Sequence, residues 1–136
     1  MNNYRARLDT IRELSSTLLH DSELYRILSR SASSPQLCKM LESFAEDCSK
    51  MSGEFTAIFR RMTGTNEPMN TAPVKESGSL RSVMNDRIFS ELKNAAGLRK
   101  LYFDSGDIFR LKRACFNAMH DAYSRAVALG AAIQIS

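Results

Sequence analysis

Apolar residues recur every three or four positions along most of the chain, the spacing that places them on one face of an α-helix. No stretch shows the sustained alternation of apolar and polar residues that is typical of a β-strand. The sequence therefore predicts an all-α protein. The helical pattern divides into four segments: Tyr4 to Ser31, Pro35 to Thr63, Ser79 to Phe103, and the residues from Asp107 to Ile133.

Serine, proline and glycine residues mark the ends of these segments. Ser34 followed by Pro35 is a favourable start of a helix, and Gly64 is a favourable end. The first and third connections are short, whereas Thr65 to Gly78 forms a longer linker. Each predicted helix would be about 35–40 Å long. The linker can reach at most about 45 Å, so it is long enough to run from one end of such a bundle to the other. The pattern predicts a four-helix bundle built from two helical hairpins with one crossover connection. A plain up-and-down bundle is the alternative.

Composition limits the function classes. The length of 136 residues predicts a single domain spanning residues 1–136. The formal net charge of +4 is spread along the chain, so we expect neither nucleic-acid binding nor membrane insertion. The first residues lead into an amphipathic pattern rather than a signal peptide. Three cysteines without paired spacing do not form a disulfide framework. These features predict a cytoplasmic protein.

One stretch of the second segment resembles a known family. The run from Ala45 to Phe55 is similar to the second helix of the rubrerythrin branch of the ferritin-like superfamily, and Arg60 to Gly64 resembles the end of that helix. The family pattern is Ala-Glu-Asp-Glu-x-x-His-Ala-x-x-Phe, in which the Glu and the His bind iron. Here Cys48 stands at the Glu position and Met51 at the His position.

The two halves of the chain also resemble each other. The run Leu24 to Leu28 is similar to Leu98 to Tyr102, and both resemble a Leu-Tyr-Arg-x-Leu stretch of the family. The run Met40 to Asp47 matches Ala114 to Asp121. The resemblance implies a ferritin-like bundle over nearly the whole chain.

The resemblance also implies where metal ligands would lie. In the family, one Glu on each of two helices and a Glu-x-x-His on each of the other two bind two metals. Carried over by position, the sites of the first three helices fall on Leu18, Cys48, Met51 and Glu91. In the fourth helix the register is open: it gives either Asp121 with Ser124 or Ala122 with Arg125. We therefore expect that the di-metal centre is lost and that no cofactor is bound, with iron or manganese as the alternative.

Several residues allow either a specific chemical role or an ordinary structural one. Glu91 is either buried with Arg125 as its partner or exposed to solvent. Cys48 and Met51 form a possible soft-metal pair, for which the third ligand would be His20 or Cys115, whereas buried apolar packing is the simpler interpretation. The remaining candidates are favoured as ordinary surface or core residues over ligands, bases or electron carriers: His20, His120, Tyr25 and Tyr102.

These observations favour a structural or interaction protein without catalytic residues. The alternatives are a di-iron or di-manganese oxidase or peroxidase with unusual ligands, and a soft-metal-binding protein. We also expect a homodimer, because the first and last helices carry apolar residues beyond one stripe. The alternative is that these residues complete the chain's own core: Leu18, Leu19, Val127, Ala128, Leu129, Ala131, Ala132 and Ile133.

Overall fold

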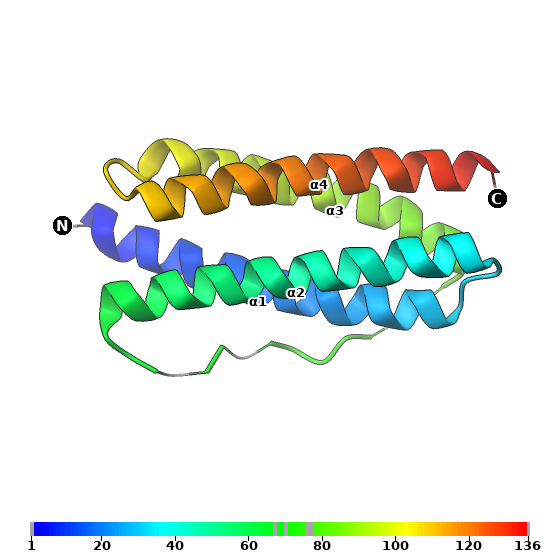
Figure 1. Cartoon of the computed structure of the whole chain (residues 1–136), viewed down its shortest axis with the longest axis horizontal. Helices are drawn as coiled ribbons and strands as arrows, with labels where there is room; N and C mark the ends of the chain where they lie inside the picture. Colours follow the sequence, from blue (N-terminus) through cyan, green and yellow to red (C-terminus); the bar gives the residue numbers. More distant parts are fainter. Residues whose placement is uncertain (1, 67, 70, 76–77, 136) are drawn as a thin grey trace.

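The computed structural model of the chain describes residues 2–66, 68–69, 71–75 and 78–135. It contains four helices, α1 (Asn2–Arg30), α2 (Pro35–Thr63), α3 (Leu80–Asp104) and α4 (Phe109–Ile135), and the described residues include no strand. The helices lie side by side in an elongated bundle (Figure 1). The prediction of an all-α four-helix bundle is confirmed, and each helix lies within a few residues of its predicted segment.

Helix ends follow the predicted capping residues. The Ser34 side chain accepts a hydrogen bond from the Leu37 N–H, and Pro35 is the first residue of α2. The helix ends at Thr63 and is capped by Gly64, whose φ of 73° lies in the left-handed region and whose N–H donates to the Arg60 carbonyl at 2.7 Å. Ser79 caps α3 in the same way as Ser34 caps α2.

Small hydroxyl residues hold α1 against α2. The Ser15 hydroxyl donates to the Ser52 carbonyl at 3.0 Å, and the Ser52 hydroxyl donates to the Ser15 carbonyl at 2.8 Å. Farther along the pair, the Ser22 hydroxyl donates to the Ala45 carbonyl at 2.7 Å. Such contacts between a side chain and a facing backbone require the two helices to approach closely. They also fix the register of α1 on α2.

The connection between α2 and α3 follows the length of the bundle. In Figure 1 it leaves the end of α2 and runs back to the start of α3, so that α2 and α3 point in the same direction. Met69 and Val74 of this connection pack against the core. Residues 67, 70, 76 and 77 of the predicted linker, and residues 1 and 136 of the predicted domain, lie outside the described part of the chain.

The apolar stripes of all four helices meet in one core. Leu18 and Leu129, which the sequence analysis assigned to a dimer surface, are buried in this core. That assignment is wrong for both residues, because each lies on the inward stripe of its own helix. No helix of the described part has a stretch apolar and long enough to cross a membrane.

Gly64, the C-cap of α2, and Gly53, inside α2, give a matched test of the cap. We expect Gly64→Ala to lower the free energy of unfolding by about 1 kcal/mol, because alanine is strained at positive φ. Gly53 lies inside the same helix, and nothing lies within 4 Å of a Cβ added at either position. Gly53→Ala should therefore raise the free energy of unfolding by about 0.5–1 kcal/mol. Urea denaturation measures both, and equal effects of the two substitutions would contradict this account of the cap.

Candidate functional site

Five polar side chains occupy inward positions where a helix bundle would ordinarily place apolar residues. They come from three helices, and each is at most 6% exposed: Asp21, Tyr25, Arg87, Glu91 and Arg125. On α1 and on α3 they are spaced four residues apart, so both side chains of each pair lie on one helix face. The result is a buried polar cluster between α1, α3 and α4, which we call the charged cluster.

Glu91 is the centre of the charged cluster and is fully buried. Its Oε2 accepts hydrogen bonds from Arg125 Nε at 2.5 Å and from the Tyr25 hydroxyl at 2.6 Å. Its Oε1 accepts a hydrogen bond from Arg125 Nη2 at 3.3 Å. Arg125 therefore binds the carboxylate in the two-pronged geometry that suits a guanidinium group. Of the two fates that the sequence left open for Glu91, the structure shows burial with Arg125 as partner.

Asp21 forms the second ion pair of the charged cluster. Its Oδ2 lies 3.0 Å from Arg87 Nη2 and accepts a hydrogen bond from Asn94 Nδ2 at 3.1 Å. Arg87 also joins the two halves of the cluster, since its Nε donates to the Tyr25 hydroxyl at 3.3 Å and its guanidinium lies over the Tyr25 ring. Tyr25 is thus a core residue with a hydrogen-bonded hydroxyl, as the sequence favoured.

The electrostatics of the cluster are balanced. Two carboxylates, Asp21 and Glu91, face two guanidinium groups, Arg87 and Arg125. Burial raises the pKa of Asp21, and the charge of Arg87 opposes that shift. Burial alone would lower the pKa of Arg125, but the acidic groups beside it, Cys48 and Glu91, raise it overall. Both arginines therefore stay charged, and with both carboxyl groups ionised the four charges of the cluster cancel.

The predicted ligand positions are only partly brought together. Leu18 and Cys48 are buried, and Cys48 lies near enough to Arg125 and Glu91 for their charges to act on its pKa. Met51 is only half-buried and lines a surface hollow between α2 and α4. Met51 therefore packs at the edge of the core, whereas Ser52 takes the buried position in that turn of α2.

The structure distinguishes the two registers of the fourth helix. Ala122 and Arg125 are buried and face the core. Asp121 is half-buried, lines the same surface hollow as Met51, and has a pKa raised by burial; Ser124 is exposed. Aligning Asp47 with Asp121 gives the register of Ala122 and Arg125. In the structure it is these two residues of α4 that face inward.

The charged cluster does not fit a di-metal centre. Both carboxylates already accept hydrogen bonds, and two guanidinium groups stand beside them where metal charge would be needed. Arg125 Nη1, a buried polar atom without a hydrogen bond among the described residues, is a donor and offers no lone pair to a cation. Within the described part of the chain, no group of three or more His, Cys, Asp or Glu residues is arranged to hold a metal ion.

The soft-metal alternative finds little support in the geometry. Burial raises the pKa of Cys48 to about 12, which keeps its thiol protonated at neutral pH, whereas metal ligation requires the thiolate. Cys115 has a similarly raised pKa, for which burial is again the main cause, and its partner is Ser105. His20 is half-buried beside Asp21, at 3.6 Å between Nδ1 and Oδ1.

Two members of the charged cluster, Asp21 and Arg87, are missing from the sequence-based site. A signal for them exists in the sequence. The core positions Leu18, Asp21, Tyr25 and Leu28 of α1 recur at three- and four-residue spacing, and Met84, Arg87, Glu91 and Ala95 do the same on α3. A charged residue inside an apolar stripe lowers stability unless it is paired. The positions of Asp21 and Arg87 within these two stripes therefore indicate that both residues need a buried partner.

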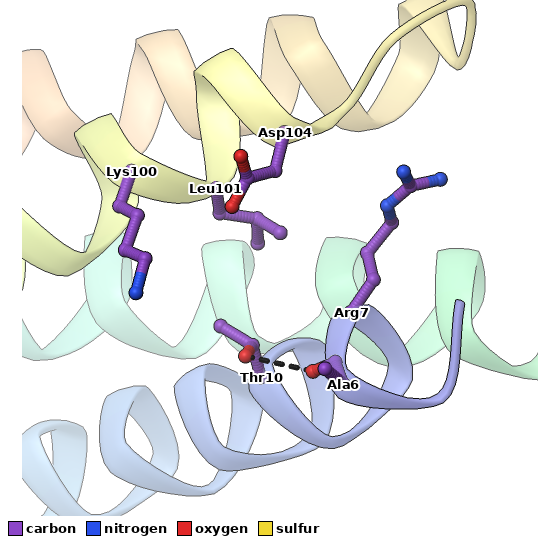
Figure 2. Close-up of a pocket in the computed structure, with 6 residues that line it drawn as sticks. All are labelled: Ala6, Arg7, Thr10, Lys100, Leu101 and Asp104. Atoms are coloured by element: carbon purple, nitrogen blue, oxygen red, sulfur yellow. Dashed lines mark hydrogen bonds between the residues drawn. The ribbon is translucent and has the colours of Figure 1, made fainter. Parts of the chain in front are cut away.

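The residues that line two surface hollows form no arrangement comparable to the charged cluster. Figure 2 shows one of about 250 Å³, with Arg7 rising from α1 and with Lys100 and Asp104 extending from α3. The Thr10 hydroxyl at its rim donates to the Ala6 carbonyl at 2.9 Å and is therefore committed to its own helix. His120 lines the hollow that also contains Met51. Neither hollow brings a nucleophile to a base among the residues that line it.

Comparisons of the chain with models of protein families, with curated proteins and with solved structures find no match. The resemblance to the ferritin-like superfamily therefore stays a prediction from the sequence motifs.

Removing one member of the Glu91–Arg125 pair should be far more harmful than removing both. We expect Arg125→Leu to lower the free energy of unfolding by roughly 3–5 kcal/mol, because it leaves a buried carboxylate without its main partner. The double variant Glu91→Leu/Arg125→Leu removes both charges and should recover at least half of that loss. Urea denaturation of the two variants measures the difference.

The surface ion pair between Glu54 and Arg110 provides the control for this experiment. It joins α2 to α4 with similar two-pronged geometry, but Arg110 is exposed and Glu54 is only half-buried. Arg110→Leu should change stability much less than Arg125→Leu, because solvent screens the pair. If Glu91→Leu/Arg125→Leu were as unstable as Arg125→Leu, the instability of Arg125→Leu could not be attributed to an unpaired buried carboxylate.

Thiol reactivity should separate the three cysteines. All are free, but only Cys38 is accessible, while Cys48 and Cys115 are buried. With an aromatic disulfide reagent at pH 8, we expect one fast-reacting thiol in the native chain and three after unfolding. A buried thiol with a pKa of about 12 holds about one thiolate per ten thousand at this pH. Cys38→Ser should abolish the fast reaction, and rapid native labelling of Cys48 would contradict the burial described here.

Proposed function

We propose that this chain is a ferritin-like bundle of the rubrerythrin type that has lost its di-metal centre and acts as a structural or interaction protein. The observation that supports this proposal most directly is the pairing of Glu91. Its carboxylate, at the position where the family resemblance implies a metal ligand, is bound by Arg125 and Tyr25. A guanidinium group thereby supplies the positive charge that a metal would supply in the family.

The arrangement of the helices supports the ferritin-like part of the proposal. α1 packs mainly against α2, and α3 mainly against α4, which is the packing expected of two helical hairpins. The long connection follows the bundle lengthwise (Figure 1), as a crossover connection would. In a plain up-and-down bundle, α2 and α3 would instead run in opposite directions and be joined by a short loop.

The balance of charge supports the loss of the metal. A di-metal site needs carboxylates and imidazoles with free lone pairs, whereas Asp21 and Glu91 are each paired with an arginine. The cluster can therefore do for the bundle what a metal would do structurally, by tying α1, α3 and α4 together. The free state of all three cysteines agrees with a role in the cytoplasm, where thiols stay reduced.

Metal analysis tests the proposal. The chain is produced in medium supplemented with iron and manganese, purified without chelator, and analysed by inductively coupled plasma mass spectrometry. We expect well under one metal ion per chain, and we expect the melting temperature to be unchanged by added Fe²⁺, Mn²⁺ or a chelator, since a ligand that binds only the folded state would raise it.

The other results have distinct meanings. About two iron or manganese ions per chain would overturn the proposal in favour of an oxidase or peroxidase with unusual ligands. About one copper or zinc ion per chain, lost in Cys48→Ala, would favour a soft-metal-binding protein. Arg125→Leu serves as a further check, because metal binding gained only in that variant would show that the guanidinium excludes metal from the site.

A further inference from the structure

The exposed apolar side chains of this protein are gathered on one half of the bundle. α3 and α4 form one half, and α1 and α2 form the other (Figure 1). Apart from Tyr4, every large apolar side chain that is exposed in the described part of the chain belongs to α3 or α4. Most of them form two rows, one on each helix: Phe89, Leu92 and Phe103 on α3, and Phe109, Phe116, Tyr123 and Val127 on α4.

Helical spacing places each row on the outward side of its helix. The α3 row recurs at three- to seven-residue spacing when Ala96 is included, and the α4 row recurs at four- and seven-residue spacing. The rings protrude, since Phe103 is 67% exposed and Phe109 is 77% exposed. Between the rows, Tyr102 packs against Phe103 at 5.3 Å and against Phe116 at 6.3 Å between ring centroids, which fills the space between the helices there. We call the two rows, with Tyr102 between them, the seam face.

Cations lie beside both rows. Arg99 is exposed on α3, and its guanidinium lies over the Phe103 ring at 5.7 Å from the ring centroid. The Lys112 ammonium lies over the Tyr102 ring at 5.0 Å from the centroid. These cation–π contacts keep both charges at the level of the rings. Two further exposed cations lie next to the rows: Lys93 and Arg113.

The carboxylates near α3 and α4 lie on other sides. Asp104 lines the hollow between α3 and α1 (Figure 2), and Asp86, about five helical turns earlier, lies on the same side of α3. Asp121, the one acidic residue of α4, lines a hollow between α4 and α2. Asp107 lies in the turn that joins α3 to α4. The seam face is therefore apolar along its rows and positively charged at its edges.

We propose that the seam face binds the surface of a membrane that contains anionic lipids, with α3 and α4 lying flat in the plane of the headgroups. The protruding phenylalanine rings enter the boundary between headgroups and acyl chains, and the cations beside the rows contact lipid phosphates. Helices that lie on membranes combine bulky apolar residues with Lys and Arg in this way, and the long stems of Lys and Arg keep their charges at the headgroup level. No helix spans the bilayer in this arrangement.

The chemistry of the seam face favours a lipid surface over other occupants. A second copy would bring cations against cations, with no carboxylate in either seam face to pair with them. A nucleic acid carries phosphates along its whole length and needs cations throughout its groove, whereas both rows are uncharged. A folded protein partner needs a matching pocket for each protruding ring. A fluid lipid surface adapts to the rings and supplies negative charge at the edges.

Sedimentation with sucrose-loaded vesicles tests the proposal, using phosphatidylcholine alone or with about one third phosphatidylglycerol. We expect the unmodified chain to bind the mixed vesicles at least tenfold more strongly, and less strongly at high salt. Arg99→Gln/Lys112→Gln should weaken this binding roughly tenfold or more. Lys39→Gln/Arg61→Gln is the matched control, because it removes the same charge from exposed positions on α2, and it should have a much smaller effect. Circular dichroism checks that both variants fold.

Tryptophan fluorescence identifies the face that meets the lipid, because the chain contains no tryptophan of its own. The emission of Phe116→Trp should shift to shorter wavelength when the mixed vesicles are added, since the ring leaves water. Ser43→Trp places the probe at an exposed position on α2, and its emission should not shift.

Three results would overturn the proposal. Failure of the unmodified chain to bind the mixed vesicles would leave the seam face to a protein partner. A shift of Phe116→Trp that grows with protein concentration in the absence of vesicles would assign the face to a second copy. Equal loss of binding in the two charge variants would show that net charge, and not the seam face, controls binding.

This inference names a partner for the interaction part of the proposed function and rests on it in that respect. Vesicle binding and metal content are measured separately. A chain that binds no vesicles but also no metal would refute the membrane contact alone, whereas a chain that holds two iron or manganese ions would refute the metal-free role whatever it does with vesicles.

Discussion

The buried carboxylate of Glu91 needs an opposite charge and hydrogen-bond donors, and the packing of the helices in this bundle provides them. An ionised carboxylate in an apolar core is tolerated only when an opposite charge and hydrogen-bond donors accompany it. Arg125 supplies the charge and two donors, and Tyr25 supplies a third. Because these partners come from α4 and α1, Glu91 on α3 can be satisfied only when three helices are in place.

The second ion pair extends this constraint. Arg87 pairs with Asp21 and donates to the Tyr25 hydroxyl, so the two carboxylates and two guanidinium groups form one connected set. Hydrogen bonds are directional, and apolar contacts are not. The charged cluster therefore fixes how α1 sits on α3 and α4, where apolar packing alone would allow small shifts. The serine contacts of α1 with α2 perform the same task within that pair.

The same charges explain why a ferritin-like resemblance and the absence of its usual ligands can coexist. A four-helix bundle with acidic residues inside needs positive charge at its centre. Metal ions are one source, and arginine side chains are another that costs no cofactor. On the proposal that arginines take the place of metal in this chain, the positions that the resemblance implies as ligands become ordinary core or surface residues. Buried Cys48 and half-buried Met51 illustrate the two outcomes.

The sequence alone determined the helices and most of their ends, because capping and apolar spacing are local properties. Ser34, Pro35 and Gly64 act within a few residues of themselves, and the inward stripes follow from helical periodicity. It also suggested that Glu91 would need Arg125 if buried. Tertiary structure decided the rest of the cluster. Asp21 and Arg87 are 66 residues apart in number but 3.0 Å apart in space, and only the packing of α1 on α3 determines that contact. Whether a given apolar residue of α4 is covered, as Leu129 is and Val127 is not, likewise depends on the rotation of each helix against its neighbours, which local spacing does not specify.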